Sequence, residues 1–80
     1  MKDYVATFHT HLSALMTCRN LTNGGVNARM MPVFRKLSSS CGTCVVYRAQ
    51  GPCLEQMDED VERVYEITGE EEYLLLFENE

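Results

Sequence analysis

Turn-forming residues divide this chain into short segments, and their spacing limits the folds that it can adopt. They fall at Asn23-Gly24-Gly25, at Gln50-Gly51-Pro52 and at Gly69. Because glycine and proline often end helices and strands, each interval can hold only one or two short elements. The 80 residues have room for one hydrophobic core. We therefore expect a single domain, residues 1–80, built from short elements.

Apolar residues between these turns follow patterns that predict four strands and two helices. The expected strands are Tyr4 to Phe8, Val26 to Pro32, Thr43 to Ala49 and Tyr73 to Phe77. Thr10 is the expected N-cap of a first helix that runs to about Thr22. A second helix is expected between Pro52 and about Ile67, because apolar residues there recur at helical spacing; they are Leu54, Met57, Val61, Val64 and Tyr65.

The order of these elements, β-α-β-β-α-β, predicts an α+β fold of the ferredoxin-like split-sandwich type. With right-handed crossovers it gives a four-stranded antiparallel sheet in the order 4-1-3-2, with two helices on one face. The second strand then lies at an exposed edge. The connection between the second and third strands lies at the same end of the sheet as the start of the first helix. We therefore expect Ser38 to Cys41 beside His9 and His11.

The charges are separated along the chain. Between Tyr4 and Leu54 there is no acidic residue, and the basic residues there are Arg19, Arg29, Arg35, Lys36 and Arg48. Between Glu55 and Glu80 there are eleven acidic residues and a single basic one, Arg63. Such an acidic surface repels phosphate groups, so we do not expect the protein to bind nucleic acid.

The sequence also bears on the compartment. The longest apolar run, Tyr73 to Phe77, is far too short to span a bilayer. Met1-Lys2-Asp3 leads directly into a strand pattern, so we expect no signal peptide and no membrane partner. We accordingly expect a cytoplasmic protein with reduced cysteines.

The densest chemistry lies in the segment Ser38-Ser39-Ser40-Cys41-Gly42-Thr43-Cys44. A thiol reacts as its thiolate, which neighbouring cations or a helix N-terminus stabilise. Arg35, Lys36 and a protonated His9 or His11 are candidates for that role. Gly42 can turn backbone N–H groups toward the sulfur, and Ser38, Ser39 and Ser40 add donors that suit an anionic sulfur or selenium atom.

The second thiol of the segment, Cys44, is expected to pack under a helix, although a role beside Cys41 stays open. An extended chain places the two Cα atoms about 10 Å apart, too far for a disulfide. A zinc site normally needs four ligands in two close pairs, and Cys53 is expected at the opposite end of the sheet. We therefore expect no metal site.

Through Leu37-Ser38-Ser39-Ser40-Cys41-Gly42, between two predicted strands, the chain resembles the selenium/sulfur carrier protein-like family of small bacterial proteins. The resemblance extends to Tyr4 to Phe8 and to Pro32. It implies a ferredoxin-like fold and a carrier thiol at Cys41. That thiol would hold a persulfide or selenopersulfide, received from a donor such as a cysteine desulfurase and passed to an acceptor protein, with no other cofactor. Cys44 and Cys53 depart from the family's usual pattern.

Other functions are compatible with the same residues. A small interaction or regulatory module would use the acidic second helix and tail, or the face of the sheet, as its contact surface. A dithiol redox element would require a bond between Cys41 and Cys44. A homodimer is compatible with the expected exposed edge strand. A carrier or accessory protein fits the residues better than a stand-alone enzyme, because they supply no complete catalytic triad.

Overall fold

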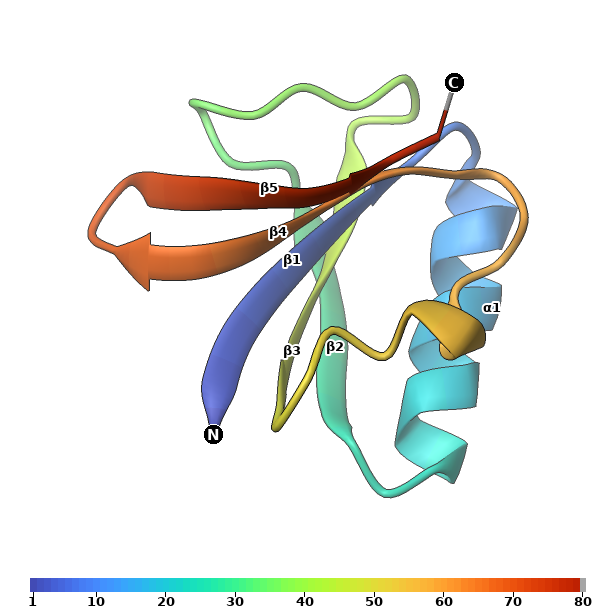
Figure 1. Ribbon diagram of the computed structural model, residues 1–80. Coiled ribbons are helices and arrows are strands. Elements are labelled where there is room, and N and C mark those ends of the chain that lie inside the picture. The colour runs from blue at the N-terminus through green and yellow to red at the C-terminus, as the bar shows by residue number, and fades with distance from the viewer. Residues whose placement is uncertain (80) are drawn as a thin grey trace.

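A five-stranded antiparallel sheet with one helix packed on one face forms the framework of the protein (Figure 1). The computed structural model describes residues 1–79. In chain order the elements are β1 (Lys2–Phe8), α1 (His11–Asn23), β2 (Asn27–Pro32), β3 (Thr43–Ala49), the 3-10 turn η1 (Leu54–Gln56), β4 (Val61–Gly69) and β5 (Glu72–Glu78). The strand order is β2-β3-β1-β4-β5. The expected α+β class is thus confirmed.

The expected second helix and the four-stranded ferredoxin-like order are wrong. Residues 61–67 of that segment belong to β4, which pairs with β1, and the last strand pairs with β4 as a fifth strand. The apparent helical spacing comes from a β-bulge. Phe8 pairs with Val61 but Thr7 pairs with Arg63, so the sheet register shifts by one residue. That shift turns Val61 and Val64, three positions apart, to the same face.

The first half of the chain agrees with the sequence analysis. The arrangement of β2, β3 and β1 side by side follows the expected order, with β2 at an edge. Thr10 caps α1, since its side chain accepts a hydrogen bond from the Ser13 N–H at 3.1 Å. No helix within residues 1–79 has the length and apolar character that crossing a bilayer requires.

The main hydrophobic core lies between α1 and the sheet. Tyr4, Ala6 and Phe8 of β1 pack there against Ala14 and Leu21 of the helix. The alternate side chains of β1, which include Val5 and Thr7, are also fully buried on the opposite face. Because β1 is central and covered on both faces, its sequence is a nearly continuous run of apolar residues.

Part of that opposite face is covered by the connection between β2 and β3, residues 33–42. The ring of Phe34 stacks on Tyr73 of β5, with centroids 5.8 Å apart. The Lys36 Nζ donates a hydrogen bond to the Glu71 carbonyl at 3.3 Å. Figure 1 shows this connection, in green, beside the β4–β5 hairpin. It therefore carries Cys41 on a segment that is supported by the last two strands.

Candidate functional site

Cys41 lies in the turn that leads into β3, and its side chain is half-buried. Its Sγ is 3.6 Å from the Ser39 Oγ and 3.6 Å from the Thr43 carbonyl oxygen. The turn is closed by the Gly42 N–H, which donates to the Ser39 carbonyl at 3.2 Å. Gly42 has a φ of 74°, a left-handed conformation that glycine adopts without steric cost. The glycine thus fixes how the thiol is presented.

Ser39 joins this turn to the end of β1. Its hydroxyl donates to the Phe8 carbonyl at 2.8 Å and lies 3.3 Å from the Thr43 carbonyl. The same hydroxyl is as close to the Cys41 sulfur as the Thr43 carbonyl is, at 3.6 Å. Ser39 therefore positions the turn and places its hydroxyl beside the sulfur.

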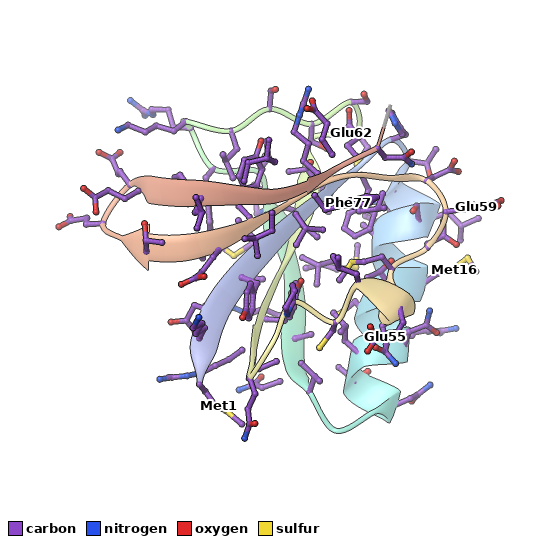
Figure 2. The ribbon with its side chains drawn as sticks, in the orientation of Figure 1. Met1, Met16, Glu55, Glu59, Glu62 and Phe77 are labelled. Carbon is purple, nitrogen blue, oxygen red and sulfur yellow. The ribbon has the colours of Figure 1, made fainter. Side chains whose placement is uncertain are left out.

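Ser40 is held by a carboxylate that the sequence analysis missed. The Glu62 carboxylate of β4 accepts bonds from the Ser40 N–H and hydroxyl, each at 2.9 Å. Figure 2 shows Glu62 on the side of the molecule where the 33–42 connection lies. Partial burial raises the pKa of Glu62, but the hydrogen bonds from Ser40 and the charge of His9 outweigh it and hold the pKa below its usual value.

Glu62 was missed because residues 61–64 were expected in a helix. Its signal in the sequence is weak: β-branched residues surround it, as is typical of strands, but no motif marks the bulge. The bulge brings Glu62, 22 positions away in sequence, next to Ser40.

The two histidines lie where the sequence placed them. The Nδ1 of His9 is 3.5 Å from the Ser40 Oγ and 3.5 Å from the Glu62 carboxylate. The Nδ1 of His11 is 3.4 Å from the Thr43 Oγ1. The expectation that this connection reaches the start of α1 is therefore confirmed.

The cationic surroundings that were expected from Arg35 and Lys36 differ from what the structure shows. Lys36 turns toward the Glu71 carbonyl, and no hydrogen bond or ion pair among residues 1–79 joins Arg35 or Lys36 to Cys41. Ser38 is exposed. Within residues 1–79, Glu62 and His9 are the ionisable side chains whose polar contacts reach Ser40 in the thiol-bearing turn.

Each of the remaining cysteines has a pKa above its ordinary value. Cys44 is fully buried, and its Sγ is 3.7 Å from the Pro32 carbonyl. Burial, reinforced by the nearby Cys41 thiol and partly offset by the Phe34 N–H, raises the pKa of Cys44 to about 11. Burial also raises the pKa of Cys18 and of Cys53. All four cysteines are free thiols.

The structure forms a surface hollow away from this turn. A surface hollow of about 210 Å³ lies at the other end of the sheet and is lined by Asp3, Asn27, Arg29, Val46, Tyr47 and Arg48. Among residues 1–79, no three His, Cys, Asp or Glu side chains are grouped as metal ligands.

The chain matches one protein family. The family model described as "Putative Se/S carrier protein-like" matches residues 3–77 and thus includes every element of the fold. No curated protein and no solved structure matches the chain significantly.

Proposed function

This chain belongs to the Se/S carrier protein-like family, and we propose that it carries a sulfane sulfur or selenium atom on Cys41 between partner proteins. One observation carries the assignment to Cys41. It is a half-buried thiol on a glycine-containing turn, with the Ser39 hydroxyl 3.6 Å from its sulfur. Cys44, the other thiol of the segment, is fully buried.

The transfer needs no external oxidant. The Cys41 thiolate attacks the terminal sulfur of a persulfide on the donor, which we propose is a cysteine desulfurase. The donor's S–S bond breaks, a new S–S bond forms on Cys41, and the donor leaves as a thiolate. Attack by an acceptor's nucleophile on the terminal sulfur then releases Cys41 as a thiolate. A donor that carries selenium would give the corresponding selenopersulfide by the same steps.

The residues around Cys41 support this exchange. The Ser39 hydroxyl, which donates to the Phe8 carbonyl, can instead turn its proton toward an anionic sulfur and stabilise it modestly. The bonds from Ser40 to Glu62 hold the turn that presents the thiol. Such exchange is best served in a reducing compartment, so we propose a cytoplasmic location.

Mass spectrometry tests the proposal directly. The reduced protein is incubated with a cysteine desulfurase and cysteine, and the intact mass is measured. We expect a gain of one sulfur atom that is absent in Cys41→Ala and persists in Cys44→Ala. An adduct that follows Cys44, or no adduct, contradicts the proposal. A loss of two hydrogen atoms that requires both cysteines would instead indicate dithiol redox chemistry.

A further inference from the structure

The outer strand β5 has an exposed apolar surface. It lies at the end of the sheet and pairs with β4 alone among the strands (Figure 1). Leu74, Leu75 and Leu76 at its centre are 52%, 45% and 38% exposed. Three consecutive exposed leucines on an edge strand are unusual, because such an edge can pair with strands of other chains.

The opposite edge is protected in a way that β5 is not. Strand β2 ends at Pro32, which has no N–H to donate, and it carries Arg29 at an exposed position. Between Glu72 and Glu78, β5 contains neither proline nor any charged residue. The apolar edge of β5 therefore lacks the residues that would prevent another strand from pairing with it.

The acidic residues at the ends of β5 affect which strands can pair with it. Glu70, Glu71 and Glu72 precede the leucines, and Glu78 follows them. In residues 1–79, no ion pair includes the first three glutamates, while Glu78 pairs with Arg63 at 2.8 Å. Two copies of β5 paired antiparallel about Leu75 would place Glu72 opposite Glu78 at both ends. Like charges directly opposite each other destabilise a strand pair, so the charges disfavour self-pairing.

We propose that the free edge of β5 binds an extended segment of a partner protein by strand addition, and that this segment has an apolar centre flanked by Lys or Arg. Main-chain hydrogen bonds would extend the sheet, the leucines would contact the apolar centre, and the glutamates would pair with the basic flanks. The site is independent of Cys41 chemistry and stands whether or not Cys41 accepts sulfur.

The test uses a synthetic peptide, Lys-Arg-Val-Ile-Val-Thr-Val-Lys-Arg with blocked ends, and a control with Glu in place of each Lys and Arg. Binding to the reduced full chain is followed by fluorescence anisotropy and by backbone amide NMR. Leu75→Lys is compared with Met16→Lys. Met16 lies on α1, as Figure 2 shows. It is 44% exposed and Leu75 is 45% exposed, so the two variants add the same charge at similarly exposed sites on different elements.

We expect saturable binding of the basic peptide, amide shifts centred on β5, and binding about tenfold weaker in Leu75→Lys, while Met16→Lys is unchanged. The acidic control peptide should not bind. The proposal is overturned by absent binding, by equal binding of both peptides, or by equal loss in both variants. A dimer in sedimentation equilibrium that Leu75→Lys alone dissociates would also overturn it, because a second copy would then be the occupant.

Discussion

The Glu62 carboxylate accepts two hydrogen bonds from Ser40, one from its backbone N–H and one from its hydroxyl, each at 2.9 Å. One side chain of β4 thus satisfies two donors of the residue next to Cys41. Bonds to an ionised carboxylate are shorter and stronger than neutral ones, so this pair fixes the conformation of the turn. The fixed conformation of the turn that holds Cys41 therefore depends on β4, a strand that lies further along the sequence.

Replacing Glu62 should loosen the turn without unfolding the protein. In Glu62→Ala we expect amide exchange of Ser40 to accelerate about tenfold and the free energy of unfolding to fall by about 1 kcal/mol. Glu66→Ala is a matched control, because Glu66 is on the same strand and, within residues 1–79, its carboxylate forms an ion pair with Lys2, at 3.8 Å, and not with Ser40. Equal protection of the Ser40 amide in both variants would contradict the prediction.

Alkaline pH should reduce stability through Cys44. Its pKa is about 11 when folded, against an ordinary value of 9.0 for the unfolded chain. The protonated Cys44 thiol therefore makes its full contribution to the free energy of unfolding below pH 9. That contribution is lost as the pH rises to about 11, because the thiol ionises first in the unfolded chain. The loss should be about 2 to 3 kcal/mol.

Urea denaturation of the wild type and Cys44→Ala across this range isolates the effect. Near neutral pH the variant should be less stable by about 1 to 2 kcal/mol, because the deletion leaves a small cavity. Other titrating groups, including Tyr47, are common to both proteins. The stability advantage of the wild type should therefore vanish and reverse between pH 9 and 11, and a constant difference would show that Cys44 does not ionise in this way.

Alkylation should separate the two thiols of the motif. Cys44 is fully buried with its pKa raised to about 11, whereas Cys41 is half-buried on a turn. At pH 8 we expect Cys44 to react with iodoacetamide about a hundredfold more slowly than Cys41. Peptide mass spectrometry after timed quenching measures both rates. Comparable rates in native protein would mean that Cys44 is not shielded.

Gly42 should be more sensitive to substitution than Gly51, the glycine of the next turn. A Cβ at Gly42 would have no atom within 4 Å, but its φ of 74° is unfavourable for alanine. We expect Gly42→Ala to lower the free energy of unfolding by about 1 kcal/mol. Gly51→Ala, which also has open space and no positive φ, should be neutral or slightly stabilising. Equal urea midpoints for the two variants would argue against backbone strain at Gly42.

The sequence was sufficient for the first 49 residues and for the last strand, and misleading for the segment that holds β4. Local signals such as the Thr10 cap and the apolar run of β1 determined these elements from neighbouring residues. They also placed the thiol turn beside His9. In β4, one bulge changed the two-residue period of a strand into the spacing of a helix. No local pattern reveals which strand will pair across 50 positions, so the contact of Glu62 with Ser40 could not be predicted.

The central position of β1 has a consequence for how the chain is made. Phe8 is synthesised 53 positions before Val61, the residue that pairs with it on the β4 side. Until the last hairpin leaves the ribosome, one edge of an apolar strand stays uncovered beside whatever part of the fold has already assembled. A fragment that stops at Ala49 would keep that edge permanently, and such truncated products should aggregate where the whole chain does not.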